Sequence, residues 1–391
     1  MGFSLALILV GGLLFYALFE KIKLPGLLGM ILLGILMGPF GFNLISKEIL
    51  VISSDLRKIA LIVILLRAGL SIERESLNQV GLPAVLLSVI PGLFEALTVM
   101  VLAMFFFDLS WIDGGVLGFI LAAVSPAVIV PKMITLIERK KGAKHSVPTL
   151  ILAGASIDDV VAITFFTSFV TLAIGSHVNF AISLAMIPLS VIIGLVIGGI
   201  IGILLIVFFK RYHIRDTKKV MILLGVALLF STFEDTFPSI PFASLLAIMA
   251  IGFILLEKYP ILANRLSIKF NKVWVFAQLL LFVLIGAEVN IHVIFQAGWV
   301  GLIIILVGLF ARSGGVWLSL LPSKLTYKEK MFTIISYWPK ATVQAAIGAI
   351  PLSLNLPYGE LFLAIAVLAI IVSAPLGAIA IDISTERLLD D

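Results

Sequence analysis

The sequence predicts an all-α integral membrane protein, and three observations support that fold class. Hydrophobic residues make up 61% of the 391 residues and charged residues only 13%, whereas soluble domains carry about 25% charged residues. The mean hydropathy is +1.23. The apolar residues also come in runs of roughly the 20 residues with which a helix crosses a bilayer. The composition therefore excludes a soluble protein and points to a chain embedded in lipid.

About thirteen apolar segments follow one another, and each ends close to charged residues, proline or glycine. We expect helices over residues 3–20, 25–44, 57–72, 80–107, 112–137, 147–175, 180–209, 219–237, 240–257, 272–291, 295–321, 330–351 and 358–381. The first segment has no basic leader and no small-residue cleavage site, so we expect it to remain as a span. The longest polar connections, residues 210–219 and 257–272, are expected to be loops.

Lysine and arginine determine the expected orientation. Most of the 27 basic residues lie in the odd-numbered loops and after the last span, whereas the even-numbered loops hold only Lys47, Arg57 and Lys58. Basic loops stay in the cytoplasm, so we expect a multi-pass protein of the cell (inner) membrane with its N-terminus outside and its C-terminus inside. The net charge of +5 then faces an anionic lipid surface, and no nucleic-acid partner is expected.

Five ionisable residues lie deep inside predicted spans, and they are the first candidates for function: Glu95, Asp158, Asp159, Arg312 and Lys340. An acid at the bilayer centre costs about 2.5–3.5 kcal/mol on insertion scales, so it faces a cavity, a partner or a transported ion. Asp158 and Asp159 are adjacent, and successive helical residues point about 100° apart. The two carboxylates therefore share one wide cavity or do different work.

Two of the predicted spans contain helix breakers. Residues 112–137 are interrupted at Pro126 and again at Pro131, and residues 330–351 at Pro339. Proline removes a backbone donor and frees a carbonyl, and free polar backbone at membrane depth is tolerated only inside protein or beside a wet cavity. We therefore expect two discontinuous helices at the functional centre, although simple kinks in packed helices are the alternative.

A short repeat indicates that the chain has two related halves. The motif Gly-Leu-Phe precedes Glu95 at residues 92–94 and recurs just before Arg312 at residues 308–310. The broken spans lie at a similar offset. Inverted-topology repeats with broken helices are typical of secondary transporters, so we interpret the two halves as inverted repeats.

Four segments together resemble one family. ASIDDVVAI, SPAVIVP, WPKATVQAAIG and LLRAGL are similar to segments of the cation/proton antiporter superfamily, most closely its NHA group of sodium/proton antiporters. The resemblance covers nearly the whole chain and implies the NhaA-type antiporter fold, with crossed discontinuous helices and elevator-like alternating access in a homodimer. A core (transport) subdomain would cover residues 57–175 and 272–381, and a dimerisation (scaffold) subdomain residues 1–56 and 180–257.

The resemblance also implies roles for single residues. Asp159 matches the main cation ligand and proton carrier, and Asp158 matches a neighbour that pairs with the lysine of the broken helix, here Lys340. Glu95 and Arg312 match an intramembrane ion pair of the NHA group. The secondary oxygen ligands for a sodium or lithium ion are expected to be Ser156 and Ser125.

Taken together, these expectations describe a secondary active antiporter for pH homeostasis that exchanges sodium or lithium for protons, because the cation and protons compete for the same carboxylates. We expect neither an enzyme nor a cofactor, and Na⁺ or Li⁺ bound at the two aspartates is the cargo. Cysteine is absent, so thiol and disulfide chemistry are excluded. Exchange would be electrogenic if Lys340 lost its proton when its pair with Asp158 opened.

Other functions are weighed against antiport. An intramembrane aspartyl protease takes its two aspartates from separate helices with a GxGD-type signature, whereas here they are adjacent and the signature is absent. A potassium/proton antiporter, a sodium-coupled symporter and a cation channel remain open as alternatives. Flux that saturates and reverses with an imposed pH gradient distinguishes exchange from a channel.

Overall fold

The computed structural model describes residues 1–22, 24–70, 74–175, 180–212, 214–237, 240 and 242–389. Within these ranges the side chains of some residues are not described, and three of them are predicted site residues, namely Ser156, Pro126 and Pro131. The other side chains that are not described are those of residues 74–80, 127, 138, 180–188, 191, 235 and 296. The described residues form helices and no strand, which confirms the all-helical class.

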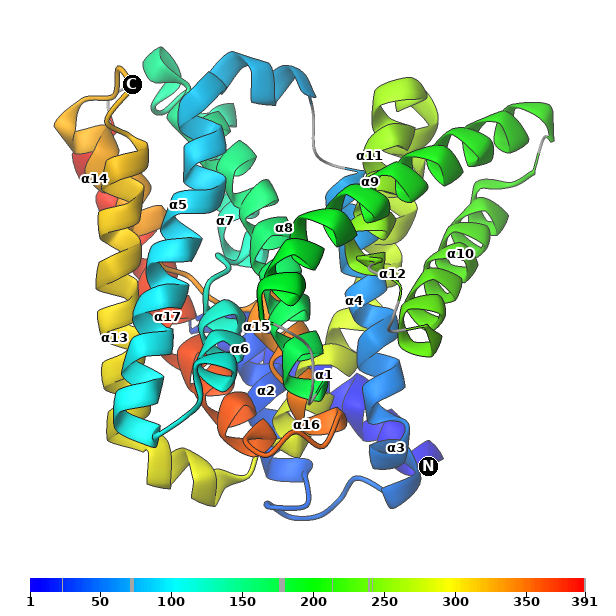
Figure 1. Ribbon diagram of the computed structural model, residues 1–391, viewed down its shortest axis with the longest axis vertical. Coiled ribbons are helices and arrows are strands. Elements are labelled where there is room, and N and C mark those ends of the chain that lie inside the picture. The colour runs from blue at the N-terminus through cyan, green and yellow to red at the C-terminus, as the bar shows by residue number, and fades with distance from the viewer. Residues whose placement is uncertain are drawn as a thin grey trace.

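Seventeen α-helices and one short 3-10 helix make up the described part (Figure 1). They are α1 (Gly2–Lys21), α2 (Gly26–Met37), α3 (Lys47–Val51), α4 (Ser53–Gly69), α5 (Arg74–Phe107), α6 (Trp111–Leu121), α7 (Pro126–Glu138), η1 (Ala143–His145), α8 (Val147–Ile174), α9 (Phe180–Arg211), α10 (Asp216–Thr236), α11 (Ser244–Lys258), α12 (Pro260–Glu288), α13 (Ile291–Ser319), α14 (Tyr327–Ser336), α15 (Thr342–Ile347), α16 (Ile350–Ser353) and α17 (Gly359–Leu388). Seven helices in this part are long and apolar enough to cross a membrane.

The loop expected over residues 257–272 is wrong, because the chain is helical from Pro260 onward. The buried residues of this stretch recur every four positions, at Leu262, Leu266, Phe270 and Trp274. That spacing places them on one face of a helix, with the charged residues on the other. The charges therefore mark a solvated helix face and not an irregular segment.

Helix contacts divide the molecule into two groups. In the first group α5 packs against α6, α8 and α13, α7 packs against α8, and α17 packs against α13 and α14. In the second, α2 and α4 pack against α12, and α4 and α9 pack against α11. The ion pair between Arg57 and Glu288, at 2.9 Å, fastens α4 to α12. The contacts thus place α4 and α12 with the second group, whereas we expected residues 57–72 and 272–291 in the transport subdomain.

The outer surface of the bundle is apolar. Large exposed side chains cover α1, α9 and α13, and on α13 Phe295 and Trp299 are 79% and 81% exposed. Such a surface is a liability in water, whereas lipid chains cover it in a bilayer. Several charged side chains, among them Glu95, Arg312 and Lys340, are buried inside instead, and this arrangement agrees with a multi-pass membrane protein. The two chain termini lie at opposite ends of the bundle (Figure 1).

Candidate ion-binding site

The site forms where two interrupted helices meet. Residues 122–125 separate α6 from α7, and residues 337–341 separate α14 from α15. The backbone N–H of Ser125 donates to the carbonyl of Pro339 at 2.8 Å, so the two breaks contact each other directly. Pro126 is the first residue of α7, a position where the missing N–H costs nothing. The structure thus has the two discontinuous helices that Pro126 and Pro339 predicted, but the second interruption expected at Pro131 is wrong, because α7 continues through this position as one helix.

Gln344 is a site residue that the sequence analysis missed. It is fully buried in α15, and its Nε2 donates to the carbonyl of Ala123 at 2.8 Å and to that of Leu121 at 3.5 Å. The last carbonyls of a helix lack partners within the helix, so Gln344 satisfies two such groups at the end of α6. A lone glutamine inside the apolar segment ATVQAAIG was the available signal.

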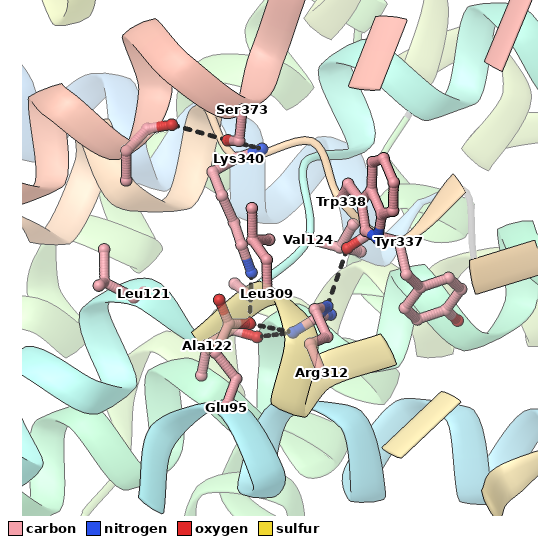
Figure 2. A network of polar contacts seen from close by, with 12 residues as sticks. Glu95, Leu121, Ala122, Val124, Leu309, Arg312, Tyr337, Trp338, Lys340 and Ser373 are labelled. Carbon is pink, nitrogen blue, oxygen red and sulfur yellow. Dashed lines mark hydrogen bonds and ion pairs between the residues drawn. The ribbon is translucent and has the colours of Figure 1, made fainter. Parts of the chain in front are cut away.

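Arg312, on α13, is the centre of the polar network (Figure 2). Its side chain is fully buried, and Nη1 donates to Glu95 Oε2 at 2.9 Å while Nη2 donates to Asp158 Oδ2 at 2.6 Å. Nε donates to the carbonyl of Tyr337 at 2.9 Å, and Nη1 also bonds to the carbonyl of Ala122. Guanidinium is always charged and presents its donors in a rigid fork. Arg312 therefore joins both helix breaks to two acids, and the expected pair with Glu95 is present.

Lys340 binds a different acid from the one expected. Its Nζ donates to Glu95 Oε2 at 2.5 Å (Figure 2), and its backbone N–H donates to Ser373 Oγ on α17 at 3.0 Å. The pair that we expected between Lys340 and Asp158 is not the arrangement in the structure. Asp158 Oδ2 instead accepts from Arg312 and from the backbone N–H of Val124 at 2.8 Å.

The two adjacent aspartates have different surroundings. Both are buried on α8, but Asp158 accepts two hydrogen bonds through Oδ2 whereas Oδ1 of Asp159 has no partner in the described part of the chain. The second oxygen of Asp158, Oδ1, is also unpaired there. Arg312 and Lys340 thus pair with Glu95, and Arg312 with Asp158, whereas no ion pair to Asp159 is present among the described residues. This difference in hydrogen-bond partners favours different roles for the Asp158 and Asp159 carboxylates.

The expected secondary ligands are only partly described. Ser125 is fully buried at the crossing, with Oγ 3.5 Å from Thr342 Oγ1. The side chain of Ser156 lies outside the described residues. Among the described residues, no group of three or more His, Cys, Asp or Glu side chains could hold a metal ion.

Comparison with known proteins identifies the family. Residues 5–385 match the transmembrane sodium/hydrogen exchanger family. The chain belongs to the sodium/hydrogen exchanger family. Sodium/hydrogen exchanger 9B2 of Mus musculus is 34% identical over 384 residues, covering 94% of this chain and 69% of the relative. Sodium/hydrogen exchanger 9B1 of Homo sapiens is 33% identical over 388 residues, covering 94% of this chain and 73% of the relative.

A solved structure has the same fold as this exchanger. The sodium proton antiporter MjNhaP1 from Methanocaldococcus jannaschii superposes with a TM-score of 0.83 at 22% identity, covering 98% of this chain and 97% of that chain. Sodium/hydrogen exchangers are transporters, so family membership confirms that the protein is not an enzyme. It also confirms the predicted place among cation/proton antiporters and the multi-pass membrane location.

Proposed function

We propose that the protein is a secondary active sodium(lithium)/proton antiporter in which Asp159 carries the cation and the proton in turn. The observation that carries the proposal is the buried carboxylate of Asp159, whose Oδ1 has no partner among the described residues, whereas Arg312 and Lys340 pair with the other two acids. The names of the related sodium/hydrogen exchangers support the choice of substrates.

The mechanism follows from competition at one carboxylate. An ionised acid in a membrane interior requires a counter-charge, and a sodium ion or a proton can supply it for Asp159. Sodium binds after the proton leaves, and a proton arriving from the other side displaces sodium. Because both ligands use the same group, a lower pH raises the sodium concentration needed for half-maximal exchange. The fixed charges of Glu95, Arg312 and Asp158 keep the surroundings of the site unchanged during this swap.

We also propose the finer architecture that the sequence predicted: thirteen spans in two inverted repeats, assembled as a homodimer with elevator-like movement. The division into two groups of helices supports a transport part and a scaffold part. Their approximate limits remain residues 57–175 with 272–381, and 1–56 with 180–257, and the contacts of α4 and α12 favour moving these two helices to the scaffold. Termini at opposite ends (Figure 1) support an odd number of spans, and the distribution of basic residues favours a cell-membrane protein with its N-terminus outside and its C-terminus in the cytoplasm.

Reconstitution into liposomes with an internal pH dye tests the function. Adding sodium or lithium outside should move protons in the opposite direction, with a rate that saturates and a direction that reverses when the pH gradient is reversed. Response to potassium alone would favour the potassium/proton antiporter. Cation flux that neither saturates nor moves protons would favour a channel and contradict the proposal.

Electrogenic exchange stays a prediction that depends on Lys340, and in the structure the partner of this lysine is Glu95 and not Asp158. A second proton per sodium ion requires a second group that titrates during transport, and Lys340, bound to Glu95, is the candidate. We expect a transient current when sodium is added to proteoliposomes on a solid-supported membrane, and loss of that current in Lys340→Met. Full exchange without any current in the intact protein would show that Asp159 works alone.

A further inference from the structure

Tyr337, at the end of α14, has a hydroxyl without a hydrogen-bond partner in the described part of the chain. The residue is fully buried, and its backbone carbonyl accepts the hydrogen bond from Arg312 Nε. Buried polar groups are nearly always paired, so an unpaired one calls for a water, an ion or a functional explanation. Neither the sequence motifs nor the proposed function assigns a role to this hydroxyl.

Two contacts locate the Tyr337 side chain, one with Gly154 on α8 and one with the guanidinium of Arg312. A Cβ added at Gly154 on α8 would lie 2.2 Å from the Tyr337 oxygen, so the hydroxyl fills the space that a side chain would take. Gly154 precedes Asp158 by one helical turn, and positions four apart share a helix face. On its other side, the Tyr337 ring lies 5.4 Å from the Arg312 guanidinium carbon, whose Nη2 binds Asp158.

The two aspartates that follow Gly154 on α8 also have oxygens that are unpaired in the described part of the chain. Besides the Tyr337 hydroxyl, Oδ1 of Asp158 and Oδ1 of Asp159 lack partners among the described residues. A second glycine makes room there, since a Cβ at Gly92 on α5 would lie 3.3 Å from Asp158 Oδ1. Hard cations bind oxygen ligands, and a phenol can accept a cation or a water hydrogen through its lone pairs while it donates to a carboxylate.

We propose that the Tyr337 hydroxyl is a further ligand of the transported cation, directly or through one water, and helps to set the apparent affinity for sodium. The inference rests on the proposed antiport at Asp159. Gly154 contributes to this arrangement, because the absence of a side chain there lets the Tyr337 hydroxyl reach this face of α8.

Tyr337→Phe tests the inference with the loss of a single oxygen atom. In proteoliposomes we expect the apparent KM for sodium to rise about threefold to tenfold, the size of one lost hydrogen bond, while the saturated rate changes less than about twofold. Ser336→Ala is the matched control, because it removes a buried hydroxyl one residue earlier that donates to the carbonyl of Phe332 in its own helix. An unchanged KM in Tyr337→Phe would overturn the inference.

Gly154→Ala disturbs the Tyr337 hydroxyl by a substitution on α8. It provides a second test of the inference if Tyr337→Phe does not fold. The new methyl group would collide with the hydroxyl, so we expect a similar rise in KM. In the double variant with Tyr337→Phe the methyl group should add little, because the oxygen that it displaces is gone. Additive effects of the two substitutions would contradict a shared action on the cation.

A binding measurement separates this inference from the proposed function. Sodium should raise the melting temperature of the purified intact protein, with a smaller rise in Tyr337→Phe and the full rise in Ser336→Ala. Exchange by Asp159→Asn at the intact rate would overturn the proposed function itself. Inactive Asp159→Asn together with an intact KM and an intact thermal shift in Tyr337→Phe would overturn only the role of Tyr337.

Discussion

Asp159→Asn is expected to reduce cation/proton exchange to the background of protein-free liposomes while the protein stays folded. The amide can neither carry the proton nor supply the negative charge that sodium requires. Oδ1 of Asp159 has no partner in the described residues, and no ion pair of Asp159 among these residues would be broken. The melting temperature should therefore be no lower than that of the intact protein, because an uncompensated buried charge has been removed.

The matched control for this experiment is Asp382→Asn. Asp382 lies on α17, its side chain is 68% exposed, and it pairs with Lys132. Pairs this exposed contribute little to stability, so exchange and melting temperature should both stay close to those of the intact protein. If Asp159→Asn exchanged sodium for protons at a comparable rate, the assignment of the carrier would be wrong.

Arg312→Met is expected to damage the fold itself. It removes the base that Glu95 and Asp158 share, and it leaves the carbonyl of Tyr337 without its donor. Removing one partner of a buried ion pair costs about 3–5 kcal/mol, so we expect a loss of at least that size in the free energy of unfolding. Denaturant titration in detergent micelles, followed by tryptophan fluorescence, measures it.

Arg265→Met provides the comparison for this loss. Arg265 on α12 pairs with Asp216 at 3.2 Å, but its side chain is 53% exposed. An exposed pair is worth about 0–1 kcal/mol, so this variant should unfold close to the intact protein. An Arg312→Met protein as stable as Arg265→Met would mean that the network does not hold the two helix breaks together.

The sequence predicts the broad architecture because hydropathy and helix breakers are local signals. Runs of apolar residues locate the helices, and Pro126 and Pro339 locate the two interruptions. The buried charges are also visible, since an acid or base in an apolar run stands out whatever its partner is. Family membership then follows from short motifs that retain these features.

The partner of each buried charge cannot be predicted from local sequence signals, because it depends on which side chains meet across the helix bundle. We expect Lys340 to pair with Asp158, but it contacts Glu95, and Asp158 is held by Arg312 and the Val124 N–H. The helical start of α12 was missed for a related reason. Its lysines and arginines indicate a solvent-exposed segment, which we interpreted as a loop. The spacing of Leu262, Leu266 and Phe270 indicates the buried face of a helix, and the segment is helical.

The order of synthesis gives the ion network a further consequence. Arg312 follows Asp158 by 154 residues, and Lys340 follows Glu95 by 245 residues. At about 5–20 residues per second, the ribosome completes Asp158 roughly 8–30 s before Arg312. The acidic half of the network therefore enters the membrane before its bases exist, and α5 and α8 reach their final packing only after α13 has been made. A truncation that ends before Arg312 would leave both acids without a partner and should expose the nascent protein to membrane quality control.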